Sequence, residues 1–180
     1  MLQRPTVKIC EKLDNNYGAF VPVHSYHGDM KTILCPIDFS KVSRQVMAEA
    51  AGLASALKGR VVLLHVVQPP VIVNEYGAAD VAAITLRLEQ EADRHLARLK
   101  KPRQALRPAW LTNRRTGSPV WVILDEAKKI SADYIVLGSH GHTAFYDLLV
   151  GSTAEGVLKK ASCPVLIVPQ VKLKSAKAKR

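Results

Sequence analysis

The amino-acid sequence predicts an α/β fold, a single doubly wound sheet of five parallel strands with helices on both faces. Strand-like and helix-like patterns alternate from residue 31 onward, and four helices separate the five strands. The strand candidates are continuous apolar runs, which are typical of parallel strands covered on both faces. The chain has 180 residues, 48% of them hydrophobic, which is ample for one core and tight for two. In such a sheet, ligands bind at the carboxyl ends of the strands.

Each element is placed by the spacing of its apolar residues and by the signals at its ends. Gly59 stands at the position that a helix C-cap requires, and Pro102 ends the second helix. Pro119 is tolerated in the first turn of the third helix, where a missing N–H costs little. In chain order we expect a strand at 31–37, a helix at 43–58, a strand at 60–67, a helix at 79–100, a short strand at 108–111, a helix at 120–130, a strand at 133–137, a helix from residue 152 and a strand at 163–168.

The chain is expected to form one domain at residues 31–170, between two segments of different composition. Residues 1–30 have no sustained periodicity and predict a loosely ordered N-terminal extension, in which Met30 is a candidate for the natural start of translation. Residues 171–180 predict a flexible basic tail. Because the chain has no apolar run of about 18 residues and no signal-peptide pattern, we expect a soluble cytoplasmic protein without a membrane partner.

The net charge of +11 raises the possibility of a nucleic-acid ligand, but its distribution argues against one. The tail supplies a large share of this charge, and the rest is spread over helix faces without interleaved aromatic residues. We therefore expect a solvated basic surface and no nucleic-acid partner. The three cysteines lack a C-x-x-C spacing, so neither a disulfide framework nor a zinc site is expected, and Cys35 and Cys163 should be small buried hydrophobes.

A glycine-rich segment after the fourth strand predicts a phosphate site. Gly138-x-x-Gly141-x9-Gly151-Ser152-Thr153 leads from an apolar run to the start of a helical pattern. Unpaired amides and the positive end of the helix dipole meet there, and glycines let an anion approach the backbone. Two alternatives stay open: Ser152 and Glu155 also fit a capping box, and a single glycine after a strand can simply form a turn.

The end of the first strand predicts the other half of this site. Asp38 follows Pro36 and Ile37, where a carboxylate can accept from a ribose hydroxyl or an exocyclic amine, although an N-cap or turn role is the alternative. The end of the second strand offers backbone groups to a flat base, whereas His65 is expected to be a satisfied core histidine. His140 and His142 have no third metal ligand nearby, so we expect no metal site in the protein itself. Ser139, Ser152 and Thr153 have no apparent base, and catalytic residues stay unknown.

Six motifs together resemble the universal stress proteins of the UspA type, over about residues 31–170. They are Ile33-Leu-Cys-Pro-Ile-Asp-Phe-Ser40, Leu63-Leu-His-Val66, Gly117-Ser-Pro119, Ala132-Asp-Tyr-Ile-Val-Leu-Gly-Ser-His-Gly141, Leu148-Leu-Val-Gly-Ser152 and Ser162-Cys-Pro-Val-Leu-Ile-Val-Pro169. The resemblance implies the strand order 3-2-1-4-5 and a homodimer formed through the last strand, Val165 to Val168. It also implies a nucleotide site made by Pro36, Ile37, Asp38, Val66, Gly138, Ser139, Gly141, His142, Gly151, Ser152 and Thr153, in which position 142 varies within the family.

The function that this resemblance implies is an ATP-binding stress-response protein that acts through nucleotide-dependent dimer or partner interactions. AMP and ADP are alternative ligands, and Mg²⁺ would accompany the phosphates. Any enzymatic activity would be limited to slow ATP hydrolysis or autophosphorylation. Two alternatives stay open, an interaction module with a non-functional pocket and an adenylating enzyme of related fold, although Pro36 to Ser40 lacks the phosphate signature of such enzymes.

Overall fold

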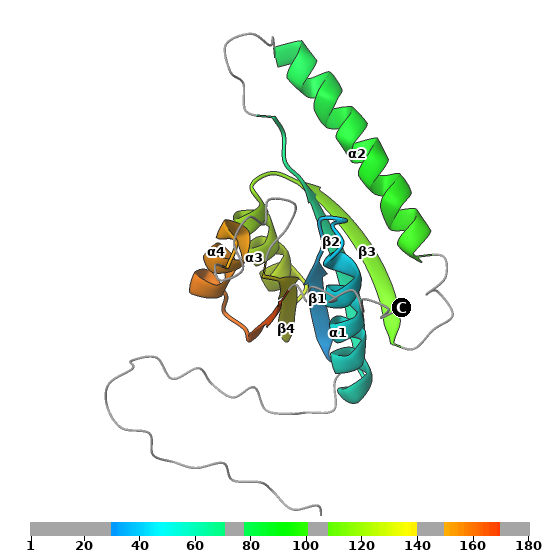
Figure 1. Cartoon of the computed structure of the whole chain (residues 1–180), viewed down its shortest axis with the longest axis vertical. Helices are drawn as coiled ribbons and strands as arrows, with labels where there is room; N and C mark the ends of the chain where they lie inside the picture. Colours follow the sequence, from blue (N-terminus) through cyan, green and yellow to red (C-terminus); the bar gives the residue numbers. More distant parts are fainter. Residues whose placement is uncertain (1–29, 71–77, 101–107, 140–149, 170–180) are drawn as a thin grey trace, which may run out of the picture.

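The computed structural model describes residues 30–70, 78–100, 108–139 and 150–169, and it confirms the expected fold. Its five strands form one parallel sheet in the order β3-β2-β1-β4-β5 (Figure 1). The elements are β1 (Thr32–Pro36), α1 (Ser43–Ala56), β2 (Arg60–Val67), α2 (Ala78–Lys100), β3 (Ala109–Thr116), α3 (Pro119–Lys129), β4 (Tyr134–Gly138), α4 (Ser152–Lys160) and β5 (Val165–Val168).

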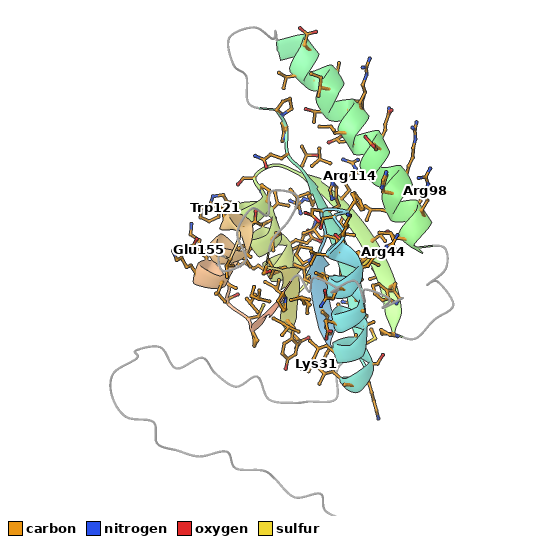
Figure 2. All side chains as sticks on the ribbon, viewed as in Figure 1. Lys31, Arg44, Arg98, Arg114, Trp121 and Glu155 are labelled. Atoms are coloured by element: carbon orange, nitrogen blue, oxygen red, sulfur yellow. The ribbon has the colours of Figure 1, made fainter. Side chains whose placement is uncertain are left out.

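Side chains of the central strand β1 alternate between two apolar layers, one on each face of the sheet. Ile33 and Cys35 pack with buried residues of α1 and with Leu96 of α2. Leu34 packs in the opposite layer, with buried residues of α3 and α4. Figure 2 shows this division, with Arg44 and Arg98 on the α1 and α2 side and Trp121 on the α3 and α4 side. Burial raises the pKa of the Cys35 thiol to about 12, so Cys35 is a small buried hydrophobe, as expected.

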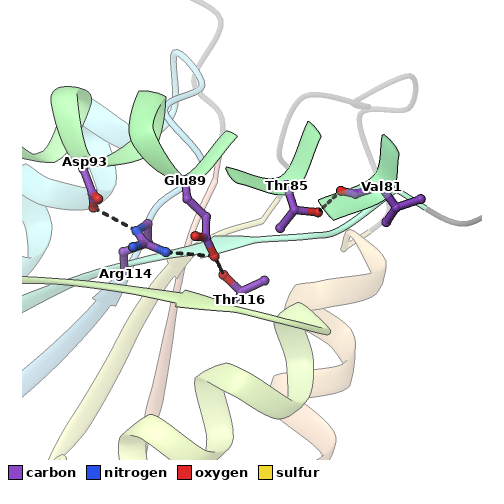
Figure 3. Close-up of polar contacts among 6 residues, drawn as sticks. All are labelled: Val81, Thr85, Glu89, Asp93, Arg114 and Thr116. Atoms are coloured by element: carbon purple, nitrogen blue, oxygen red, sulfur yellow. Dashed lines mark hydrogen bonds and ion pairs between the residues drawn. The ribbon is translucent and has the colours of Figure 1, made fainter. Parts of the chain in front are cut away.

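Strand β3 is longer than expected and ends at Thr116, five residues beyond the predicted end at residue 111. It pairs with β2 in eight successive positions, from Ala109 to Thr116. Its second half is polar and lies at the edge of the sheet, where ion pairs with the helices replace apolar burial. Arg114 contacts Glu89 and Asp93 of α2 (Figure 3), and Arg115 contacts the buried Glu126 of α3. An apolar pattern could not reveal a strand that is held by such pairs.

The end of α1 also differs from the expectation, because Gly59 is not the residue with the left-handed backbone. Lys58 has φ 52°, while the Gly59 amide donates to the Ala54 carbonyl over 2.7 Å. A Cβ on Gly59 would lie 2.3 Å from the Lys31 carbonyl oxygen. The glycine is therefore required by the close approach of the backbone before β1.

Strand β5 lies at the edge of the sheet opposite β3. It begins at Val165, and Cys163 lies before it and is half-buried.

The same substitution at two glycines should change stability in opposite directions. We expect Gly59→Ala to destabilise the fold by about 1–3 kcal/mol, because its Cβ meets backbone that cannot easily move. Gly52→Ala should stabilise it by up to about 1 kcal/mol, since Gly52 lies inside α1 with open space around it. Urea denaturation measures both free energies of unfolding. A destabilisation by Gly52→Ala as large as that by Gly59→Ala would contradict this account.

Candidate functional site

A pocket of about 270 Å³ opens at the carboxyl edge of the sheet. Its walls come from the ends of β1, β2 and β4, from the first turns of α1 and α3, and from the start of α4. The lining residues are Pro36, Ile37, Asp38, Ser40, Val42, Ser43, Val46, Leu64, Val66, Pro119, Ile123, Leu137, Gly138, Ser139, Gly151, Ser152, Thr153 and Ala154. Asp38 is the one charged residue among these described lining residues.

Nine of the residues expected in the site line this one pocket. They are Pro36, Ile37 and Asp38 at the end of β1, Val66 in β2, Gly138 and Ser139 at the end of β4, and Gly151, Ser152 and Thr153 at the start of α4. The other two, Gly141 and His142, lie outside the described residues, as does His140. The structure thus brings together segments that are more than 100 residues apart in the chain.

The start of α4 brings to the pocket backbone amides that precede the helical hydrogen-bond pattern. Gly151 is the N-cap residue, and among the described residues no side chain caps this helix end. The first intrahelical bond runs from the Glu155 amide to the Gly151 carbonyl, so the amides of Ser152 and Thr153 precede the helical bonding pattern. The capping-box alternative is wrong, because the Glu155 carboxylate pairs with Lys159 instead of reaching back. Amides of this kind, at the positive end of a helix dipole, suit an anion.

The backbone after β4 holds this helix start against the sheet. The Ser139 amide donates to the Val168 carbonyl of β5 over 2.8 Å, and the Gly151 amide donates to the Ser139 carbonyl over 2.7 Å. Two residues that are twelve positions apart in the sequence are therefore directly bonded. This contact fixes the amides of α4 next to the carboxyl end of β4.

Asp38 shapes the turn after β1 and lines the pocket at the same time. Its Oδ1 atom accepts from the Ser40 amide over 3.0 Å and from the Ser43 hydroxyl over 2.9 Å. The alternative role as a turn former is thus what the structure contains. Because Asp38 is half-buried and lines the pocket, the same turn orients a carboxylate at the pocket wall.

His65 lies behind this turn and outside the lining residues. Its Nδ1 atom is 2.9 Å from the Ile37 carbonyl oxygen, and since a carbonyl can only accept, Nδ1 carries the proton. His65 is therefore a satisfied histidine, as expected. Burial lowers its pKa below the usual value, and the hydrogen bond to Ile37 and then the charge of Asp38 partly oppose that shift.

The comparisons with known proteins agree with this fold and motif set. A family model described as the universal stress protein family matches residues 30–169. The chain belongs to the universal stress protein family. Universal stress protein MJ0531 of Methanocaldococcus jannaschii is 32% identical over 142 residues, which cover 79% of this chain and 84% of that protein.

Solved structures of universal stress proteins share the architecture. UspA from Lactobacillus plantarum superposes with a TM-score of 0.68 at 26% identity, over 79% of this chain and 99% of that chain. Protein MJ0577 of Methanocaldococcus jannaschii has a TM-score of 0.69 at 28% identity, over 79% and 97% of the two chains. The universal stress protein from Archaeoglobus fulgidus, solved in complex with dAMP, shares the fold with a TM-score of 0.53 at 21% identity, over 77% and 97%.

Several lining residues of this universal stress protein were missed by sequence reasoning. Pro119 and Ile123 reach the pocket from α3. Pro119 belongs to the motif Gly117-Ser-Pro119, but its place in the pocket wall, like that of Ile123, follows from tertiary packing. Ser40 and Ser43 lie two and five residues after Asp38, and two serines so close to this carboxylate were the available signal. The Ser40 hydroxyl oxygen is buried and has no hydrogen-bond partner within the described part of the chain.

Within the described residues, no group of three or more His, Cys, Asp or Glu side chains is arranged to hold a metal ion. None of the helices in the described ranges is both long and apolar enough to cross a membrane.

The lowered pKa of His65 predicts a specific dependence of stability on pH. Unfolded His65 binds a proton below about pH 6.5, whereas the folded protein resists protonation, so His65 costs stability as the pH falls through this range. His65→Asn keeps a donor for Ile37 and removes the titration. We expect the stability advantage of the natural protein over His65→Asn to shrink between pH 7.5 and pH 5, as measured by urea denaturation. An advantage that is constant or grows on acidification would contradict this assignment, and Gly52→Ala serves as the control that should follow the natural protein.

Proposed function

We propose that this universal stress protein binds an adenine nucleotide, with ATP as the first candidate, in the pocket at the carboxyl edge of the sheet. The observation that carries the proposal is that three segments, each suited to bind a phosphate or a nucleoside, meet at one pocket. These segments are the turn at Asp38, the end of β2 at Val66 and the amide-rich start of α4. AMP and ADP are the alternative ligands, and Mg²⁺ would accompany the phosphates.

Each wall of the pocket has a role in this proposal. The amides of Ser152 and Thr153 would bind phosphate oxygens, and glycine at position 151 leaves room for their approach. The oriented carboxylate of Asp38 would accept from a ribose hydroxyl or from the adenine amine. The backbone at Val66 and the side chain of Ile37 would contact the base. Gly141 and His142 remain proposed phosphate neighbours.

Nucleotide occupancy, and not turnover, is the proposed signal. Asp38 and His65 already donate or accept bonds within the fold, so slow hydrolysis or autophosphorylation is the upper limit that we propose for catalysis. Bound nucleotide would shift a dimer or partner equilibrium during stress. The proposal locates the protein in the cytoplasm, where adenine nucleotides are available.

Substitution of Gly151 tests the ligand without testing the fold. Its φ of −61° and ψ of 153° are accessible to any residue, so Gly151→Val should fold normally. The added side chain would obstruct the phosphates, and we expect ATP affinity to fall by about tenfold or more. Isothermal titration measures the affinity. As an independent measure, ATP at 100 times the dissociation constant should stabilise the natural protein by about 2.7 kcal/mol.

The outcomes of this experiment separate the open alternatives. Gly52 lies outside the pocket, so the Gly52→Ala variant should bind ATP as the natural protein does. Absence of both heat and thermal stabilisation at millimolar ATP would end the proposal and favour an interaction module. Pyrophosphate exchange with an added carboxylic acid would favour the adenylating enzyme.

The proposal includes a homodimer that forms through β5. This strand lies at one edge of the sheet, where it pairs with β4 alone among the described strands. Leu166 on β5 is 42% exposed. An exposed edge with an apolar side chain favours pairing with a second copy of the same strand.

The two edges of the sheet provide a matched test of this dimer. Leu166→Lys should shift the mass in solution to that of the monomer, because it places charges at the proposed interface. Leu111→Lys alters a residue of similar exposure, 45%, on the opposite edge strand β3 and should leave the dimer intact. Light scattering at micromolar protein measures both. Dissociation by Leu111→Lys alone would instead locate the interface at β3.

A further inference from the structure

Phe39 has an unusual backbone conformation immediately next to the pocket. Its φ is 63°, in the left-handed region that bulky residues rarely adopt because the Cβ atom crowds the backbone. This conformation costs free energy, so the contacts of Phe39 must hold it in place. Phe39 lies outside the pocket lining, whereas its neighbours Ile37, Asp38 and Ser40 line the pocket.

The contacts that hold Phe39 are two histidine rings from different elements. Its ring centroid lies 4.2 Å from that of His65 on β2, with an interplanar angle of 30°. The second ring, that of His95 on α2, lies at 4.9 Å with an angle of 46°. The Phe39–His95 distance falls in the range of favourable aromatic pairs, about 4.5–7 Å, and the Phe39–His65 rings lie slightly closer than that. Phe39 also packs against the apolar layer under α1 and α2.

His65 holds the same turn a second time through the backbone. While its ring contacts Phe39, its Nδ1–H donates to the Ile37 carbonyl. The Ile37 amide in turn donates to the Leu64 carbonyl over 2.8 Å, so β2 binds both backbone groups of Ile37. One imidazole therefore contacts residues on either side of Asp38, which lies between them.

We propose that His65 and Phe39 are positioning residues for the nucleotide pocket, because together they fix the turn that presents Asp38 and Ser40 to the ligand. Neither residue lines the pocket, so their effect on the ligand passes through the backbone of residues 37–40. His95 extends this arrangement to α2, whose Glu89 and Asp93 also hold Arg114 of β3. A movement of α2 would thereby reach the turn after β1. This inference rests on the proposed function.

Two variants at position 39 distinguish the effect of the aromatic ring from the effect of the backbone conformation. Phe39→Gly removes the ring and also removes the conformational strain, so the protein should fold. We expect its ATP dissociation constant to rise by about tenfold, as is typical for loss of a coupled contact. Phe39→Tyr retains the ring and should remain within about twofold of the natural protein. A structural role without positioning would leave the affinities of both folded variants equal.

The variants at position 65 test the link between the two residues. His65→Asn keeps a donor for the Ile37 carbonyl, and His65→Leu does not, so the leucine variant should lose more affinity. Because both residues act on one turn, the double variant Phe39→Gly with His65→Leu should lose less affinity than the product of the two single losses. Independent, multiplicative losses would overturn the proposed coupling.

Hydrogen exchange in the ligand-free protein tests the positioning independently of ATP. Phe39→Gly should speed exchange of the Ser40 and Ser43 amides, which bond within this turn, and leave α3 unchanged. Phe39→Tyr should restore the natural rates. If the natural protein does not bind ATP, the proposed function fails, while the exchange rates still decide on the positioning. Unchanged exchange in Phe39→Gly would overturn the inference.

Discussion

The short pairing between β1 and β4 is the constraint on which the site depends. Strand β1 pairs with β2 at five successive positions, from Thr32 to Pro36, but it pairs with β4 at only two, Ile33 and Leu34. The carboxyl ends of β1 and β4 therefore separate where the chain leaves the sheet in opposite directions. Backbone that would otherwise pair within the sheet becomes a wall of the pocket. Asp38 and Gly138, which follow or end these two strands, both line this opening.

The sequence allowed most of the fold to be predicted, because buried parallel strands and amphipathic helices leave strong periodic patterns. Where burial is replaced by charge, these patterns fail. The second half of β3 is polar, and Glu126 is only 2% exposed although it is charged. The Glu126 carboxylate accepts from the Asn113 side-chain amide and from the Arg115 guanidinium, each over 2.7 Å. These residues precede Glu126 by 13 and 11 positions in the sequence. Such pairs depend on how α3 packs on the sheet, which no local spacing encodes.

The pocket was predictable for a different reason, since topology fixes where strand ends meet. Once the doubly wound order is known, residues that follow β1, β2 and β4 must lie together. Residues that enter from the sides of helices, such as Ile123, follow from packing alone and were missed. The left-handed Phe39 was equally hidden, because no sequence rule assigns that conformation to phenylalanine. The contributions of Gly141 and His142 stay predictions.

The electrostatic character of the described pocket comes mostly from the backbone. Its one charged lining residue among those described is Asp38, so within this part of the wall any attraction for a phosphate would come from backbone amides and the dipole of α4. Each such contribution is modest, about 0.3–1 kcal/mol at an exposed helix end, so binding of the proposed nucleotide would be readily reversible. Asp38 Oδ1 accepts two bonds that shape the turn, and His65 Nδ1 donates to the backbone of the same turn. These bonds hold the turn in shape, so the proposed nucleotide would meet a pocket wall that is already formed.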